Sequence, residues 1–358
     1  GRRSFLRGAG GLGAAGGIAA LAGCGSASAA EEISFWHLLS GPDGVTMGEL
    51  LGEYMATEGA GDVTQTVLGW GAPYYTKLAM ASAGGRAPDI AVMHSARVPG
   101  YAPGGLLDAW DLDLLGEFGV HQEDFPELIW DKMEVDGQLL NIALDSHPFV
   151  LYYNTEIADE AGVLDSDGLL LPTETPEDFR DLALELSGAA PSGYGLSFGW
   201  LGDGMNQWRM FYTYYTQMGG TMELPEGGTM QYQEEIAIDA IEWILSLIDG
   251  EAGNPSHDGG TAISEFATGG SGGFFGGVWE IGSYRAEGLP FDMTMVPGVF
   301  GPPTAYADSH SFVLPFQSSP DPERRRAVHA MVAHILKNSL TWADAGHIPA
   351  YAPVVEDP

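Results

Sequence analysis

The feature that most constrains the fold is an alternation between short apolar runs and longer segments with helical spacing. Three runs, at residues 33–36, 63–67 and 90–93, are bounded by glycine, proline or polar residues. Such runs are typical of buried strands in an α/β sheet. Between the first two runs, residues 47–55 place apolar side chains at the spacing of an amphipathic helix. The alternation predicts an α/β fold.

Three later segments carry signals for helices. Residues 175–178, Thr-Pro-Glu-Asp, supply an N-cap, a proline at the first helical position and acids in the first turn, and an apolar stripe follows until Gly188. Residues 236–245 repeat the stripe, and the sequence Asp-Pro-Glu at 321–323 opens another. We therefore expect a helix in each segment.

The charge balance is strongly acidic. The 358 residues include 14 lysines and arginines against 49 aspartates and glutamates, with a formal net charge of −35. A surface of this kind repels nucleic acid and anionic lipid headgroups, so nucleic-acid binding is excluded as the function. Solubility or a salt-rich habitat explains the charge without a role in ligand binding. A chain of this length is too long to fold around a single hydrophobic core, so we expect two domains.

The first 30 residues have the pattern of an export signal. Arg2 and Arg3 precede a glycine- and alanine-rich apolar run, which ends at Leu-Ala-Gly-Cys with Cys24. Small residues suit the cleavage point, and the thiol after it can carry a diacylglycerol anchor. An ordinary positive flank before a disordered tail is the alternative. We expect residues 1–30 to be a twin-arginine lipoprotein signal that leaves the mature protein anchored through Cys24 to the outer face of the cell membrane, extracellular or periplasmic.

Aromatic and polar residues gather where the predicted strands end. In open α/β sheets, ligands bind at the carboxyl ends of strands. We therefore expect the binding site at this edge of the sheet. The residues that follow an apolar run are Trp36 and His37, Trp70, His94, and Asp145 with His147.

These residue types suit a carbohydrate. A sugar ring has an apolar C–H face that packs on an aromatic plane, and a rim of hydroxyls that needs both acceptors and donors. Exposed tryptophan supplies the plane, while acids and histidines bind the hydroxyls, the acids through strong charge-assisted bonds. The candidate ligand-binding residues are Trp36, His37, Asp43, Trp70, His94, Asp145, His147, Trp200, Trp279, Glu280 and His310.

Several of these candidates also have a simple structural explanation. Trp279 ranks first among the tryptophans because two glycines precede it and Glu280 follows it, as at a strand end that opens onto a cleft. Each tryptophan has an alternative role as an ordinary core residue. Asp43 lies in a Gly-Pro-Asp-Gly sequence, which suits a tight turn without any ligand. Asp145 is the preferred acceptor, with an N-cap or a hinge hydrogen bond as its alternative.

A metal site and an enzyme active site are the two other classes of site to weigh. Histidines near loop starts supply metal ligands, but no pair has the close spacing of a motif such as His-x-x-x-His. We expect neither a metal nor a cofactor. Asp145 and Glu280 would be the paired carboxylates of a glycosidase or lyase. Because Cys24 is the only cysteine and the glycine-rich run at 8–13 lies in the leader, we find no further support for an enzyme and expect none.

The order of several motifs resembles that of a known family. Together with the leader, they resemble the family 1 extracellular solute-binding proteins of ABC importers, the group that includes maltose- and glycerol-phosphate-binding proteins. The resemblance covers nearly all of the chain after the leader. The motifs are Phe-Trp-His at 35–37, Ser-Gly-Pro-Asp-Gly at 40–44, Trp70, Tyr-Tyr-Thr-Lys-Leu at 74–78, Pro-Asp-Ile at 88–90, Asp-Ser-His-Pro at 145–148, Tyr-Tyr-Asn at 152–154, Gly-Gly-Val-Trp at 276–279, and Gly-His-Ile-Pro-Ala at 346–350.

The resemblance implies a two-lobed periplasmic-binding-protein-like (type II) fold, with a hinge between the lobes. The chain would cross from lobe one to lobe two near Leu144 and return at residues 293–297. It would cross a third time at 315–319. Lobe one would contain residues 31–144 and 298–317. Lobe two would contain residues 145–297 and 318–358.

The resemblance and the residue chemistry together predict the function. We expect a lipoprotein receptor that captures a mono- or oligosaccharide and delivers it to an ABC permease. Its partners would be the carbohydrate, the permease subunits and, through Cys24, the membrane. We expect a monomer.

Overall fold

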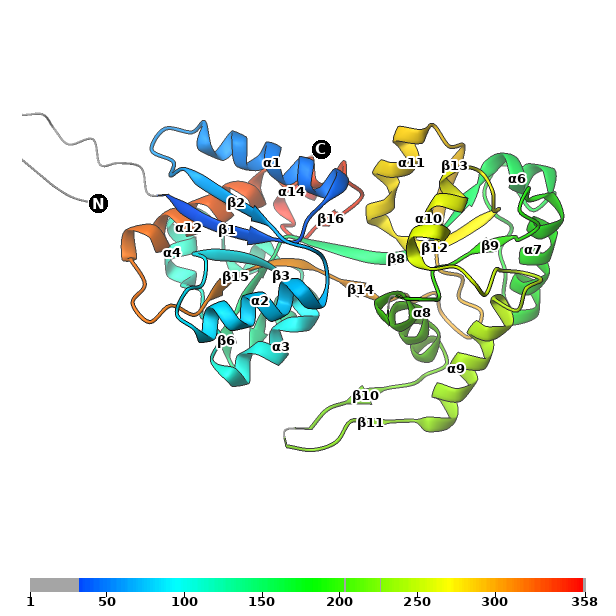
Figure 1. Cartoon of the computed structure of the whole chain (residues 1–358), viewed down its shortest axis with the longest axis horizontal. Coiled ribbons are helices and arrows are strands. Elements are labelled where there is room, and N and C mark those ends of the chain that lie inside the picture. Colours follow the sequence, from blue (N-terminus) through cyan, green and yellow to red (C-terminus); the bar gives the residue numbers. More distant parts are fainter. Residues whose placement is uncertain (1–31, 203, 226, 357–358) are drawn as a thin grey trace, which may run out of the picture.

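The protein consists of two α/β lobes that lie side by side, as Figure 1 shows for the computed structural model. The structure describes residues 32–356 apart from 203 and 226, so the predicted signal at residues 1–30, with Cys24, lies outside the described residues. Two extended segments join the lobes, β8 (Asp145–Asn154) and β14 (Ala307–Asp308). Within the described part of the chain, no helix is long and apolar enough to cross a membrane. The predicted two-lobed α/β fold is confirmed.

Lobe one is built on a six-stranded sheet with the order β2-β1-β3-β15-β4, in which β7 also pairs with β15. β1 (Ile33–His37), β2 (Val63–Val67) and β3 (Ile90–His94) are parallel and match the three predicted runs. β3 is buried along its whole length, as expected for a strand covered on both faces. β15 (His310–Pro315) pairs antiparallel with β3, β4 (Leu107–Asp108) and β7 (Asn141–Ala143).

Helices cover both faces of this sheet (Figure 1). α1 (Gly41–Met55) buries Met47 and Leu50, and α12 (Pro322–Lys337) packs against it with an apolar face that includes Met331. The other elements of lobe one are α2 (Ala72–Ala83), α3 (Val98–Tyr101), α4 (Leu112–Glu117), α5 (Glu127–Met133), β5 (Glu134–Val135), β6 (Gln138–Leu139), α13 (Leu340–Ala343), β16 (Ile348–Pro349) and α14 (Pro353–Glu356).

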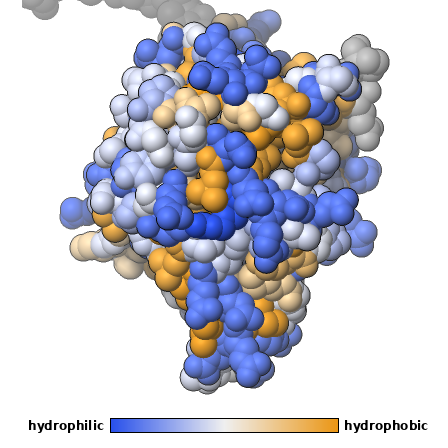
Figure 2. Space-filling model, turned by 90° about the vertical axis from the view of Figure 1, so that its right-hand side faces the viewer, coloured by the Kyte–Doolittle hydropathy of each residue, from blue (hydrophilic) through white to orange (hydrophobic). Residues whose placement is uncertain are grey.

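Lobe two has a second sheet, with the order β13-β8-β12-β9. β8 pairs antiparallel with β12 and β13, and β12 pairs parallel with β9. Figure 2 shows the outer face of this lobe, on which hydrophilic residues are interrupted by small hydrophobic patches. The elements of lobe two are α6 (Thr155–Glu160), α7 (Pro176–Ala189), β9 (Leu196–Ser197), α8 (Gly204–Gln217), β10 (Met222–Glu223), β11 (Gln231–Tyr232), α9 (Glu234–Leu247), α10 (Gly259–Ala267), β12 (Gly273–Gly277), α11 (Ile281–Glu287) and β13 (Phe291–Met295).

The three predicted helices form where their sequence signals lie. α7 begins with a capping box, in which Thr175 accepts from the Asp178 N–H and Asp178 accepts from the Thr175 N–H. α12 begins after Asp321, whose carboxylate accepts from two backbone N–H groups of the first turn. α9 covers the stripe at 236–245. Local capping chemistry therefore determines where α7 and α12 start, whereas α9 begins after Gln233 without a side-chain cap.

β8 is the central element of the hinge. Its first residues pair with β16 and β14, and its later residues pair with β12 and β13 in lobe two. β14 runs antiparallel beside it, with Asp308 opposite His147, and leads into β15 of lobe one. The residues at the start of β8 therefore lie between the lobes, in contact with segments that are distant in sequence.

The lobe boundaries differ from the predicted ones after the first crossing. β8 begins directly after Leu144, as predicted. The predicted return at 293–297 is too early, because Val299 lies in the lobe-two core and the chain returns at β14. Residues 318–358, predicted for lobe two, lie in lobe one, where α12 packs on α1, so the third crossing does not occur. The apolar stripe of α12 indicates that one face is buried but not which lobe covers it.

Candidate functional site

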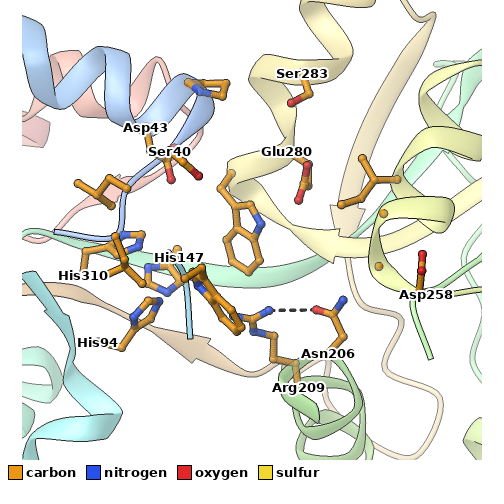
Figure 3. A pocket seen from close by; sticks show the side chains of 18 of the residues that line it. Ser40, Asp43, His94, His147, Asn206, Arg209, Asp258, Glu280, Ser283 and His310 are labelled. Atoms are coloured by element: carbon orange, nitrogen blue, oxygen red, sulfur yellow. Dashed lines mark hydrogen bonds between the residues drawn. The ribbon is translucent and has the colours of Figure 1, made fainter. Parts of the chain in front are cut away.

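A cavity of about 600 Å³ lies between the lobes (Figure 3). Lobe one contributes the start of α1 and Trp70, lobe two contributes parts of α8, α10 and α11, and the connecting strands contribute His147 and His310. The polar and aromatic side chains that line it are Ser40, Asp43, Trp70, His94, His147, Asn206, Arg209, Asp258, Trp279, Glu280, Ser283 and His310.

The start of α1 forms the lobe-one wall of the cavity. Ser40 is the N-cap in an extended conformation, and Gly41 has a φ of 60°, in the left-handed region that favours glycine. Asp43 lies in the first turn, where a carboxylate interacts favourably with the helix dipole. Its Oδ1 is 3.1 Å from Nε2 of His347. Gly-Pro-Asp-Gly is therefore the first turn of a helix and not a tight turn, and the start of this helix brings Asp43 to the cavity.

Trp70 presents an indole at the cavity from lobe one. It follows β2, and 45% of its surface is exposed. Gly71, with a φ of 85°, turns the chain into α2 directly after it. An exposed indole of this kind is a surface on which a sugar ring can stack.

Trp279 lines the cavity from lobe two, on the short helix η4 (Val278–Glu280). The Arg209 guanidinium lies 4.7 Å from the indole centroid, and the His147 ring meets the indole edge-on at 5.5 Å. A Cβ at Gly277 would lie 2.0 Å from the indole. The glycine that makes Trp279 a candidate in the sequence therefore provides the space that its ring occupies.

Glu280 is an acid whose protonation changes near neutral pH. Burial raises its pKa to about 7, and the Asp43 carboxylate adds to the rise, while the Trp279 hydrogen bond and the Arg209 charge oppose it. The side chain can therefore donate or accept a hydrogen bond in the cavity. Beside it, Arg209 donates to the Asn206 Oδ1 at 3.0 Å (Figure 3).

Three histidines form the floor of the cavity on the hinge side. The ring centroids of His94, His147 and His310 lie between 4.4 and 5.4 Å apart. His94 Nδ1 is 2.6 Å from the Tyr75 hydroxyl, and Nδ1 of His147 and of His310 is within 2.9 Å of the Asp145 carboxylate. Burial lowers the pKa of His94 and His147. Burial would also lower the pKa of His310, but the Asp145 charge raises it above its ordinary value.

Asp145 is fully buried beneath these histidines and does not line the cavity. It also accepts from the His310 backbone N–H at 2.8 Å and from the Trp342 Nε1–H at 2.6 Å. Burial alone would raise its pKa, but His310, His147 and His347 hold the pKa well below its ordinary value. Asp145 therefore makes hinge hydrogen bonds, the alternative that its sequence context left open.

Three other predicted residues do not line the cavity. Trp36 is half-buried with the Lys77 ammonium 5.0 Å from its ring centroid. His37 is fully buried, with its Nε2 3.0 Å from the Gln65 side chain. Trp200 packs against the core of lobe two. Position after a strand is a weak guide here, because successive side chains point to opposite faces of the sheet.

Five polar cavity residues were not among the sequence candidates: Ser40, Asn206, Arg209, Asp258 and Ser283. Arg209 is 6% exposed, and an arginine among the aromatic residues of α8, in a chain with few basic residues, is a usable signal for it. Asp258 caps α10 by accepting from the Thr261 N–H at 2.8 Å. No local pattern marks Asn206 or Ser283, because the fold alone brings their helices to the cavity.

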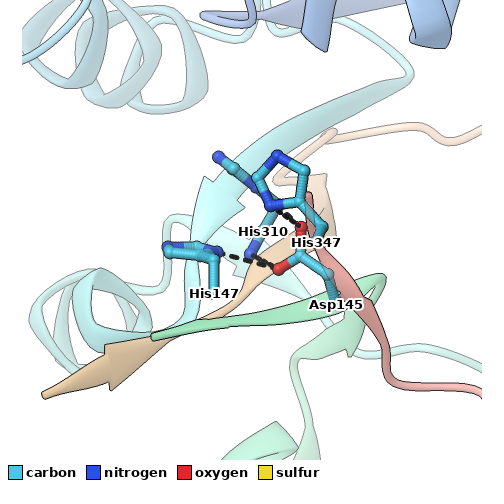
Figure 4. Close-up of side chains that lie close together, drawn as sticks. All are labelled: Asp145, His147, His310 and His347. Atoms are coloured by element: carbon cyan, nitrogen blue, oxygen red, sulfur yellow. Dashed lines mark hydrogen bonds and ion pairs between the residues drawn. The ribbon is translucent and has the colours of Figure 1, made fainter. Parts of the chain in front are cut away.

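One cluster has the composition of a metal site (Figure 4). Asp145, His147, His310 and His347 each offer one ligand atom, these atoms lie within 4.8 Å of one another, and all four residues are buried. Only Asp145 and His147 are close in the sequence, two residues apart, and no pair of its histidines is closely spaced. It forms because β8, β15 and β16 meet at the hinge.

Solved structures share this architecture. The GacH receptor of Streptomyces glaucescens, crystallised unliganded and with acarbose, is 18% identical over 92% of this chain and 82% of that chain, with a TM-score of 0.75. UgpB from Mycobacterium tuberculosis, in complex with glycerophosphocholine, is 19% identical over 92% of this chain and 81% of its own, with a TM-score of 0.77. The galacto-N-biose/lacto-N-biose I-binding protein of a Bifidobacterium longum ABC transporter is 18% identical over 90% and 79%, with a TM-score of 0.72.

A match to a protein-family model identifies the family to which the chain belongs. A search of curated proteins found no match. Residues 40–334 match the model of bacterial extracellular solute-binding proteins. This match covers most of both lobes and the connecting strands β8 and β14, including every polar and aromatic residue named above as lining the cavity. The chain therefore belongs to the bacterial extracellular solute-binding protein family.

Proposed function

We propose that this protein is the substrate receptor of an ABC importer and that its ligand is a carbohydrate. The observation that carries the proposal is the cavity between the lobes, where one tryptophan from each lobe, Trp70 and Trp279, lies with carboxylates. Indole faces suit the C–H face of a sugar ring, and Asp43, Asp258 and Glu280 suit its hydroxyls. Two of the similar proteins were crystallised in complex with acarbose and with lacto-N-biose.

The size and charge of the cavity favour a small neutral ligand. A volume of about 600 Å³ suits a mono- or short oligosaccharide. Among the described residues, the wall contains three carboxylates and a single arginine, Arg209, which already donates to Asn206. A phosphodiester ligand would place its negative charge beside these acids, which disfavours it.

Closure of the lobes is the proposed mechanism. Ser40, Asp43 and Trp70 belong to lobe one, and Asp258 and Trp279 belong to lobe two. A ligand that contacts both sets stabilises the closed arrangement, and its differential affinity for that arrangement shifts the population toward it. The permease would then recognise the closed form. We propose that the receptor acts as a monomer, anchored to the outer face of the membrane through Cys24.

The carboxylates give no support for the alternative glycosidase or lyase. That chemistry needs two carboxyl groups that flank the scissile bond. Asp145, one of the pair suggested by the sequence, is buried below the histidines, and its oxygens are occupied by four donors. We propose that the protein binds its ligand without changing it.

A thermal-shift screen of the purified protein tests the proposal. Neutral mono- and oligosaccharides are compared with polyols and with glycerophosphocholine, and hits are measured by isothermal titration calorimetry. We expect a neutral saccharide to raise the melting temperature and to be recovered intact. Stabilisation by glycerophosphocholine alone, or conversion of the saccharide, would contradict it.

A further inference from the structure

The hinge contains a cluster of metal-ligand side chains, two of which, His147 and His310, also line the sugar cavity. Asp145 Oδ1 lies 2.9 Å from His147 Nδ1, and Asp145 Oδ2 lies 2.8 Å from His310 Nδ1 and 3.3 Å from His347 Nδ1. None of the four residues is more than 6% exposed. Figure 4 shows the three imidazoles around the single carboxylate.

His347 carries the observation that points to a ligand. Its ring lies between two carboxylates, with Nε2 3.1 Å from Asp43 Oδ1 and Nδ1 3.3 Å from Asp145 Oδ2. A neutral imidazole has one N–H. Nε2 uses it for Asp43, and Nδ1 is buried without a hydrogen-bond partner. A lone pair on Nδ1 would face an anionic oxygen, an unfavourable contact that either a proton or a metal ion between the two atoms relieves.

The spacing and the donor atoms suit a transition-metal ion. Zinc binds histidine nitrogen and carboxylate oxygen at about 2.0–2.2 Å, which puts neighbouring ligands of a tetrahedral site about 3.3 Å apart. The contacts of 2.8 to 3.3 Å around Asp145 require a small outward movement, and ligand atoms that lie up to 4.8 Å apart must move closer together. Three imidazoles and one carboxylate also form a donor set that zinc prefers over calcium or magnesium.

The surroundings supply the outer hydrogen bonds that metal ligands need. Ligating histidines usually donate their second ring N–H to a carboxylate, as His347 does to Asp43. The ligating carboxylate is held by the Trp342 Nε1–H at 2.6 Å. His147 and His310 line the cavity. When Nδ1 binds the metal, the ring N–H lies on Nε2. This N–H can donate a hydrogen bond to water in the cavity.

We propose that Asp145, His147, His310 and His347 bind one zinc ion as a closed, structural four-ligand site. The ligands come from the start of β8, the start of β15 and the residue before β16. The ion therefore ties together the three segments that form the hinge. Its site lies on the Asp145 side of the histidine rings, separate from the sugar cavity. Structural zinc of this kind adds directly to folding stability.

Metal titration of the purified protein tests the site. The protein is dialysed against a chelator and then against buffer, and ZnCl₂ binding is measured by calorimetry and by equilibrium dialysis with elemental analysis. We expect one zinc ion per chain and a higher melting temperature. CoCl₂ in place of zinc should give the visible absorption of four-coordinate cobalt. A protein that takes up no metal under these conditions overturns the proposal.

Two conservative variants locate the ion. His347→Gln keeps an amide that can donate to Asp43 but removes the Nδ1 ligand, and His147→Asn keeps a donor near Asp145. Each should weaken zinc binding by about 100-fold or more. His257→Gln is the matched control, because His257 is a buried histidine 3.3 Å from Glu265 in lobe two, and it should bind zinc as the wild type does.

The wild-type protein keeps the test decisive if a variant fails to fold. A cobalt spectrum of six-coordinate type, or zinc binding that is equal in wild type and in both folded variants, overturns the site. So does a ¹⁵N spectrum of the metal-free and zinc-treated protein in which His347 carries protons on both ring nitrogens throughout, because a proton would then fill the role of the ion. Sugar binding is measured separately. A failure to bind sugar therefore leaves the conclusion about zinc unchanged, and a failure to bind zinc leaves the conclusion about sugar unchanged.

Discussion

The floor and the walls of the cavity are built in different ways. The floor residues His94, His147 and His310 are each at most 8% exposed, and their Nδ1 atoms contact Tyr75 or Asp145. The walls belong to separate lobes, and Trp70 in one wall is 45% exposed. The floor is therefore held by its own contacts, whereas the proposed mechanism has the ligand bring the two walls together. This difference separates residues that stabilise the fold from residues that determine affinity.

The largest expected effect is the loss of the buried acid below the floor. Asp145→Ala leaves the His310 N–H, the Trp342 Nε1–H and the His147 ring without their acceptor. Because unsatisfied buried donors are expensive, we expect the free energy of unfolding to fall by about 3–5 kcal/mol. Urea denaturation in the presence of EDTA measures the loss without a contribution from metal.

Asp258→Ala is the matched variant in the wall. Asp258 is also an acid that accepts backbone hydrogen bonds, but it does so as an exposed helix cap. The free energy of unfolding should fall much less in the Asp258→Ala variant than in the Asp145→Ala variant. Equal losses in the two variants would show that the floor is no more important to stability than the walls.

The second expected effect is stabilisation by the ligand. A sugar that binds only the folded protein, at a concentration one hundred times its dissociation constant, should raise the unfolding free energy by about 2.7 kcal/mol. Differential scanning calorimetry over a range of sugar concentrations measures this rise. A melting temperature that does not change with sugar concentration would contradict binding between the lobes.

The third expected effect is a change in sugar affinity that leaves the floor residues and their contacts intact. Trp279→Ala and Trp70→Ala each remove an indole from the cavity wall, and we expect each to weaken sugar binding by about 1–3 kcal/mol. Calorimetric titration gives the dissociation constants. Trp36→Ala is the control, because Trp36 lies outside the cavity beside Lys77. The affinity of this variant for sugar should equal that of the wild type.

Much of the fold follows from local sequence patterns. The runs at 33–36, 63–67 and 90–93 become strands, and the capped segment at 175–178 starts α7 where expected. The lobe to which α12 belongs could not be predicted, since its apolar stripe fits either core. Topology of this kind depends on contacts between distant segments, for which a single sequence contains no local signal.

The site shows the same limit at the level of single residues. Glycines beside Trp70 and Trp279 mark places where a bulky ring reaches the cavity, and both tryptophans line it. Trp200 also follows a glycine and Trp36 also ends a strand-like run, but neither lines the cavity, because the direction of their side chains depends on strand and loop geometry. The four-residue cluster around Asp145 was also hidden, because β8, β15 and β16 bring it together from positions up to about 200 residues apart in the chain.

The smallest expected effect is the pH dependence that Glu280 adds in the wall. Its pKa rises from 4.5 to about 7 in the folded protein, so the folded state favours the protonated acid. Stability from this group is present below pH 4.5 and is lost as the pH rises to about 7. Because the side chain is partly exposed to the cavity, we expect a difference of about 1–2 kcal/mol between pH 5 and pH 8.

Glu280→Gln isolates this contribution because the amide does not titrate. Denaturation of the two proteins from pH 5 to pH 8 should show that the variant gains stability relative to the wild type as the pH rises, by the same 1–2 kcal/mol. Asp43 and Arg209 remain in both proteins, so their charges cancel in the comparison. Parallel curves for the two proteins would mean that Glu280 is ionised throughout this range, and that the walls are as fixed in charge as the floor is in geometry.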